Sequence, residues 1–140
     1  MPTWIFFAIL SAISAALVAI FGKIGIKNLD TTLATTIRSI VMAVVLIITS
    51  LALNKFHLVG EVSNKALTFI FFSGLAGALS WLFYFQALKT GPTTAVASLD
   101  RLSVVFVLIL AALFLGEGLT WKSGLGASLI TVGAILMTLK

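Results

Sequence analysis

The stretch GPTTAVASLDRLSVVFVLILAALFLGEGLTW, residues Gly91–Trp121, decides how this chain is interpreted. Between its two glycine-containing turns lies an apolar run long enough to predict a membrane-spanning helix. Two adjacent charges, Asp100 and Arg101, stand inside that run, short of its middle. Charged side chains are costly in hydrocarbon, and within a span they usually mark a functional site. We therefore expect the rest of the chain to supply the surroundings that make this pair tolerable.

The composition indicates a polytopic membrane protein. Of 140 residues, 61% are hydrophobic and only 9% are charged, whereas a soluble domain carries about 25% charged residues. The net charge of +5 comes from nine Lys and Arg that are scattered singly, mostly at the ends of apolar runs. This pattern is typical of headgroup contacts and excludes a nucleic-acid footprint. With no Cys and a single histidine, His57, we expect no metal site and no cofactor.

Five apolar segments are long enough to cross a bilayer as helices. Their unbroken runs do not alternate as the strands of a β-barrel would, so we predict an all-α membrane protein with one five-helix transmembrane domain, residues 1–140. We expect the first segment to be retained as a helix because it lacks a basic n-region and a cleavage site. The predicted spans are Thr3 to Gly22, Thr31 to Leu53, Ala66 to Leu88, Thr94 to Leu115 and Thr120 to Leu139.

The second and fourth segments resemble one another. When Thr31 is placed over Thr93, Arg38 falls opposite Asp100. After each charge only about 20 Å of apolar helix remains, too little to cross a core of about 30 Å. Arg38 and Asp100 should therefore lie inside the membrane, at similar depth on the same side.

Asp100 needs a partner from elsewhere. Neighbouring residues on a helix do not face each other, so the sequence makes Arg101 a poor partner, while Arg101 itself can extend toward the headgroups. Arg38 is the first choice for Asp100, and Lys23 and Lys89 are the other candidates. The pair is then either a structural ion pair between two helices or part of a transport site.

An aromatic and polar face on the third segment is the other candidate for substrate contact. Trp81, Tyr84 and Phe85 precede Gln86 within two turns. Trp81 and Tyr84 are either an interfacial aromatic belt or the wall of a cavity. Ser98 and the threonines beside the charges would line the polar end of that cavity.

Small residues at helical spacing predict close helix packing, either within one protomer or across a dimer contact. These residues are Ala8, Ala12, Ala15, Ala19, Gly22, Gly74, Gly77, Gly126 and Gly133.

The loop charges scarcely favour one orientation. Lys23, Lys27, Lys89 and Lys140 fall on one side of the predicted membrane, against Lys55, Lys65 and Lys122 on the other. Lys and Arg bias sets the orientation of a membrane protein. The near balance predicts dual topology, with two copies pairing as an antiparallel homodimer of ten helices.

The chain resembles the EamA repeat of the drug/metabolite transporter superfamily over essentially its whole length. The resemblance rests on Tyr84-Phe85-Gln86-Ala87-Leu88, on Gly116-Glu117-Gly118-Leu119-Thr120 and on the glycines of the last segment. It departs from the family where Asp100-Arg101-Leu102-Ser103 stands in place of a proline. The first segment has no acidic residue, so the glutamate-based proton exchange of related four-helix transporters does not carry over.

The resemblance implies a transporter rather than an enzyme. Most members carry two inverted repeats, and a chain with one repeat would use a homodimer in their place. The implied function is secondary transport, as exporter or exchanger, of amino acids, metabolites or hydrophobic cationic compounds across the plasma or inner membrane. The alternative is a non-transporting scaffold or subunit of a larger membrane complex, in which Asp100 and Arg38 only hold helices together. A membrane enzyme is disfavoured because Asp100 is the sole acidic residue inside a predicted span.

Overall fold

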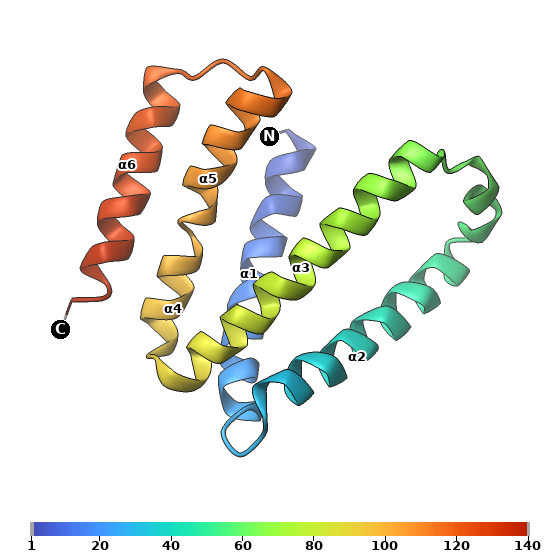
Figure 1. Ribbon diagram of the computed structural model, residues 1–140, viewed down its shortest axis with the longest axis horizontal. Coiled ribbons are helices and arrows are strands. Elements are labelled where there is room, and N and C mark those ends of the chain that lie inside the picture. The colour runs from blue at the N-terminus through green and yellow to red at the C-terminus, as the bar shows by residue number, and fades with distance from the viewer. Residues whose placement is uncertain (1, 140) are drawn as a thin grey trace. The chain divides into compact units, whose positions relative to one another are not determined.

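A computed structural model of the chain describes residues 2–139, and every regular element in that range is helical. Two of the elements are short helical variants, a 3₁₀-helix η1 and a π-helix η2. The elements, shown in Figure 1, are α1 (Thr3–Gly25), α2 (Thr31–Ala52), η1 (Phe56–Glu61), α3 (Asn64–Thr90), α4 (Thr93–Asp100), α5 (Ser103–Leu110), η2 (Ala111–Leu115) and α6 (Trp121–Leu136).

Four stretches of helix are long and apolar enough to cross a membrane: α1, α2, α3 and the run Thr93–Leu115. The fifth expected span is a shorter apolar helix. α6 has 16 residues, or about 24 Å at 1.5 Å per residue. It begins one residue later than predicted because Thr120 is its N-cap, accepting a hydrogen bond from the backbone N–H of Ser123 at 3.1 Å, and it ends at Leu136.

The chain divides into two compact units. We call Phe21–Lys89 the central unit, and Met1–Ile20 together with Thr90–Lys140 the terminal unit. The central unit contains the last turn of α1 followed by the antiparallel pair α2 and α3, which are joined through η1 (Figure 1). The terminal unit contains the rest of α1 and the elements from α4 to α6.

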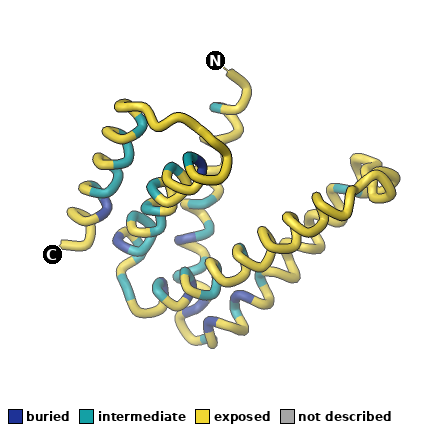
Figure 2. The backbone as a smooth tube through the Cα atoms, turned by 45° about the horizontal axis from the view of Figure 1, so that its top comes forward, coloured by how far each residue is buried: buried dark blue, intermediate teal, exposed yellow. Residues whose placement is uncertain are grey.

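The core of the central unit lies at the end away from η1, as Figure 2 shows. Ile26 and Leu88 are essentially inaccessible there, and Phe85 is buried beside them. The glycine at position 22 of α1 leaves room for the Phe85 ring of α3, because a Cβ added to Gly22 would lie 3.3 Å from that ring. The remaining faces of α2 and α3 are apolar and exposed, as expected for surfaces in contact with lipid.

The fourth predicted span, Thr94 to Leu115, forms in the terminal unit, but its helix is interrupted. α4 ends at Asp100 and α5 begins at Ser103. Around Arg101 and Leu102 the backbone bonds shorten to i→i−3, including Arg101 N–H to the Ser98 carbonyl at 3.1 Å and Leu102 N–H to the Leu99 carbonyl at 3.0 Å. Short polar side chains compete for backbone bonds and favour turns over helix interiors, which explains why the interruption falls between Ser98 and Ser103.

The end of this helix is set by glycine. The last turn widens to the π-helix η2, and Gly116 follows with a left-handed φ of 67°. Glycine adopts this conformation without steric cost and commonly ends helices. The chain then returns as α6, which packs along α4 and α5. The buried residues of these elements are alanines: Ala95, Ala111 and Ala134.

The contact at Gly22 gives a direct test of the central core. Gly22→Val is expected to lower the free energy of unfolding by about 1–3 kcal/mol, because overpacking a fitted contact forces side chains to shift. Gly25→Val is the matched control, since a Cβ at Gly25 meets nothing within 4 Å. Chemical unfolding in detergent would measure both variants, and equal stability of the two would contradict the observed packing.

Candidate functional site

A polar contact joins α2 to α3 inside the central unit. The Thr31 hydroxyl donates to the Gln86 side-chain oxygen at 2.7 Å. Thr35, one turn further along α2, donates to the Thr31 carbonyl at 2.8 Å. Both threonines are buried, and their hydroxyls are satisfied as burial in an apolar region requires.

Arg38 lies one turn beyond Thr35 and stacks on the aromatic face of α3. Its guanidinium carbon is 3.6 Å from the centre of the Trp81 ring and 5.8 Å from that of Phe85. A guanidinium over an indole face is attracted by the ring quadrupole, more strongly where water is excluded. Within the described part of this unit, no carboxylate forms an ion pair with Arg38. The cation is therefore held by aromatic rings, and its hydrogen-bond donors point to no acidic partner there.

The three aromatic rings support one another. Trp81 contacts Tyr84 and Phe85 edge-to-face, with ring centres 5.4 and 6.0 Å apart, and Tyr84 and Phe85 are 6.4 Å apart. Residues three and four apart on a helix are neighbours on its surface, so this cluster follows from the sequence spacing. Together the rings form an apolar wall beside the Arg38 cation.

The start of α2 sets the depth of Arg38. Asp30 is the N-cap, and its carboxylate accepts a hydrogen bond from the Leu33 N–H at 3.0 Å. That hydrogen bond, assisted by the charge of Lys89, lowers the pKa of Asp30 below its ordinary value. Arg38 is seven residues after Thr31 and so about 10 Å along the helix.

Asp100 and Arg101 form the charged group of the terminal unit. Their side chains approach to 3.9 Å, with 38% of Asp100 and 53% of Arg101 exposed. Arg101, which the sequence makes a poor partner for Asp100, is thus its contact in this unit, at a long 3.9 Å. The helix tightens at Arg101, where α4 ends, so the spacing rule for a regular helix no longer applies. An exposed ion pair with so long a distance contributes little to folding stability.

The structure thus brings together part of the predicted site. Arg38, Trp81, Tyr84, Phe85 and Gln86 gather in the central unit. Asp100, Arg101 and Ser98 belong to the terminal unit, where Ser98 donates to the Ala95 carbonyl at 2.9 Å. The pairing of Arg38 with Asp100 stays a prediction.

Thr31 and Thr35 belong to the threonines that the sequence placed beside the charges as a group, without assigning either one a role in the site. Their spacing of four residues, with Arg38 three further on, was the available signal, since these positions share one face of a helix.

The small residues chosen for packing have different surroundings. Ala19 is buried, Ala15, Gly22, Gly77, Gly126 and Gly133 are partly covered, and Ala8, Ala12 and Gly74 are exposed. Of the glycines in this set, Gly22 is the one whose added Cβ would meet a neighbour within 4 Å. Among residues 2–139, no three His, Cys, Asp or Glu side chains gather in a group that could hold a metal ion.

Comparison with known proteins gives a family and one informative relative. The family model described as "EamA-like transporter family" matches residues 2–139. A curated Sinorhizobium sp protein described as "Uncharacterized transporter in cobO 3'region" is 42% identical over 135 residues, which cover 96% of this chain and 96% of the relative. No solved structure matches the chain at a significant level.

The stacking of Arg38 on Trp81 predicts energetic coupling between them. In a double-mutant cycle of Arg38→Met and Trp81→Leu, we expect a coupling free energy of about 0.5–2 kcal/mol, the range for cation–π pairs from exposed to desolvated. Chemical unfolding in detergent supplies the four free energies. The control replaces Trp81→Leu by Phe83→Leu, which alters an aromatic residue of α3 that is 72% exposed. Coupling of the same size in the control cycle would rule out a specific contact.

Proposed function

The chain belongs to the EamA-like transporter family, and from this premise we propose that it is a secondary transporter that moves small molecules across a membrane by alternating access. The family match over residues 2–139 carries the proposal. The description of the 42%-identical relative as a transporter supports it. The apolar helices of the chain, with their exposed apolar faces, support a multi-pass protein in the bilayer, and we place it in the plasma or inner membrane.

The substrate-binding surface in this proposal is the side of the central unit where α2 meets α3. Arg38 offers a cation, Trp81 and Phe85 offer ring faces, and Gln86 with Thr31 offers neutral polar groups. A carboxylate-bearing metabolite or amino acid would bind the guanidinium through charge-assisted hydrogen bonds. A hydrophobic cation would instead compete with Arg38 for the Trp81 face. These substrate classes make opposite demands on Arg38, so a charge-neutral replacement there distinguishes them.

Movement in this proposal depends on Asp100. The sequence puts Asp100 and Arg38 at similar depth, and we propose that they pair in the closed state and separate in the open state. The interruption after Asp100 supports this role, because discontinuous helices are the usual site of binding and movement in transporters. The weak, exposed contact with Arg101 gives Asp100 an alternative partner in the open state.

The proposed assembly is an antiparallel homodimer in which each copy contributes five spans, α6 being the fifth. The relative that matches over 96% of its own length is of the same size, which supports a family branch built from one repeat per chain. Two inverted copies would provide the ten helices and the in-plane axis of inverted-repeat transporters. Alternating access would then exchange two chemically identical protomers between two conformations.

Removal of the Asp100 charge tests the transport mechanism. Asp100→Asn is expected to abolish substrate flux into liposomes while leaving the protein folded and dimeric, because the neutral amide loses the ion pair but keeps its size. Glu61→Gln, which neutralises an exposed carboxylate in η1, should transport normally. The substrate panel is amino acids, small carboxylate metabolites and organic cations. Full flux by the Asp100 variant would refute the gate, and a destabilised variant of a protein that transports nothing in the panel would favour a scaffold.

Dual topology gives an independent prediction. With Lys and Arg nearly balanced across the membrane, a C-terminal reporter should be found on both faces of the membrane in whole cells. The reporter is attached after Lys140, which is outside the described residues and is one of the four lysines counted on its side. Adding two lysines to the η1 loop should shift the population toward one face and lower flux. A reporter confined to one face in the unmodified chain would exclude the antiparallel dimer.

A further inference from the structure

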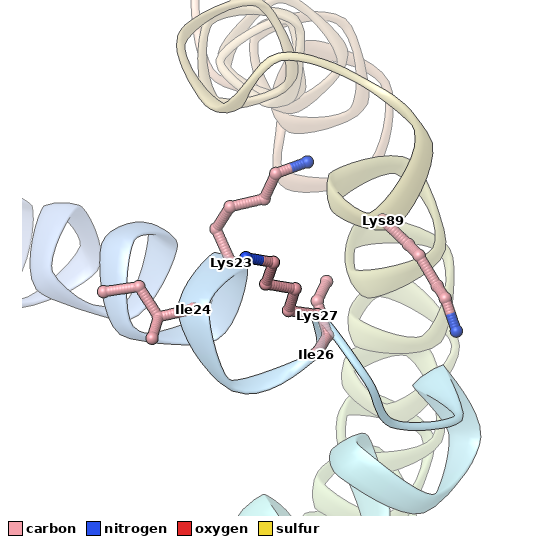
Figure 3. Close-up of a pocket in the computed structure, with 5 residues that line it drawn as sticks. All are labelled: Lys23, Ile24, Ile26, Lys27 and Lys89. Carbon is pink, nitrogen blue, oxygen red and sulfur yellow. The ribbon is translucent and has the colours of Figure 1, made fainter.

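A lysine-lined pocket of about 500 Å³ lies at one end of the central unit. Lys23 and Lys27 come from the end of α1 and the turn after it, and Lys89 comes from the end of α3 (Figure 3). Ile24 and Ile26 complete the lining. Because α1 and α3 are both candidate membrane spans that end here, we place the pocket at the edge of the membrane.

Two of the three lysines also hold the chain together. Lys23 donates to the Leu88 carbonyl near the end of α3, and Lys89 donates to the Leu29 carbonyl at 2.7 Å. A lysine in the last turn of a helix complements the helix dipole, and each of these carbonyl contacts ties a helix end to a neighbouring segment, so structure alone explains both. A carbonyl does not neutralise the charge of an ammonium group, and both positive charges remain.

Lys27 has no such structural explanation. It lies beyond the last residue of α1, it is exposed, and its side chain makes no hydrogen bond or ion pair with any described residue. Its charge nevertheless adds to those of Lys23 and Lys89 around one pocket. Like charges gathered at the membrane edge repel one another unless an anion balances them.

The chain supplies little of that balance itself. Asp30 is the acidic side chain on the loop beside the pocket, and its carboxylate already accepts the Leu33 N–H as the cap of α2. Glu61 is in η1, at the other end of the α2–α3 pair (Figure 1). Three positive charges therefore outnumber the one negative charge of Asp30 at this end of the unit, and Asp30 interacts electrostatically with Lys89.

We propose that this pocket binds a phosphate group. Lys27 and the neighbouring Lys23 would bind the phosphate oxygens, whereas Lys89, whose ammonium points away from theirs in Figure 3, would add its charge. Ile24, which is 68% exposed, would contact the apolar part of the ligand. An anionic lipid has this combination of chemistry, and basic pockets between spans are known to bind such headgroups. A free phosphate compound would present the same group. The site is separate from the Arg38 surface and does not depend on the transport proposal.

Lipid binding to the full chain in a neutral detergent tests the proposal, with native mass spectrometry as the readout. Phosphatidylglycerol should bind in preference to phosphatidylcholine. Lys27→Gln should weaken phosphatidylglycerol binding about fivefold, the effect of losing about 1 kcal/mol from one interfacial lysine, and Lys27→Arg should retain it. Lys65→Gln is the matched control, because Lys65 is at the opposite end of α3. Without lipid, Lys27→Arg and Lys65→Gln should unfold at the same temperature as the unmodified chain, and Lys27→Gln should be at least as stable, because it relieves repulsion among the lysines.

A second arm, with millimolar inorganic phosphate as the probe, separates the two sources. Thermal stabilisation by phosphate that is lost in Lys27→Gln, without preference for phosphatidylglycerol, would identify a soluble phosphate compound as the ligand. Preference for phosphatidylglycerol without a phosphate effect would identify lipid. If Lys27→Gln and Lys65→Gln behave alike in both arms, or if the unmodified chain responds to neither probe, the proposal is wrong.

Discussion

A guanidinium inside an apolar helix has to be sheltered from hydrocarbon, and the central unit is arranged around the way this chain shelters Arg38. The Trp81 ring covers the cation at 3.6 Å, and Tyr84 and Phe85 fix the ring through edge contacts. The arrangement requires α2 and α3 to approach closely. The Thr31–Gln86 hydrogen bond joins α2 to α3, and Phe85 seated against Gly22 holds α3 to the end of α1. The aromatic rings attract the guanidinium charge electrostatically and leave its N–H donors unused. Arg38 is therefore covered by the rings and still has donors for an anionic group.

Asp100 and Arg101 are also charges within an apolar helix, but they are not covered by aromatic rings. They are partly exposed and far from ideal ion-pair geometry, and the helix that carries them is interrupted beside them. An interrupted span frees backbone groups, which membrane proteins tolerate where protein or a watered cavity covers them. The two units therefore accommodate their charged side chains differently. The central unit partly covers its charge with aromatic side chains, whereas the terminal unit leaves its charges accessible and gives up helix regularity. An accessible carboxylate beside a helix break is better suited to changing partners than a stacked arginine is.

The long apolar helices could be predicted from the sequence because span length and hydropathy depend only on local composition. The second span was expected at residues 31–53 and is observed as Thr31–Ala52, with Asp30 as its N-cap. Local composition does not show which side chains of different helices contact one another. The stacking of Arg38 on Trp81 depends on which helices meet and at what depth, and the i→i−3 turn at Arg101 depends on competition among several polar groups for backbone bonds. The shortness of α6 was missed because apolar residues continue past Leu136, while the helix itself stops there.

The lysine pocket and the arginine site impose separate requirements on one short unit. Lys23 and Lys89 fasten the ends of α1 and α3 to neighbouring carbonyls, and these are the turns that position Phe85 and Leu88 in the core. An anion in the pocket would lower the repulsion among the lysines and so stabilise the same turns on which the Arg38 surface depends. Such coupling would act within one protomer. In an antiparallel pair, each leaflet would hold one such pocket, so binding of an anionic lipid would stabilise both protomers without favouring either orientation.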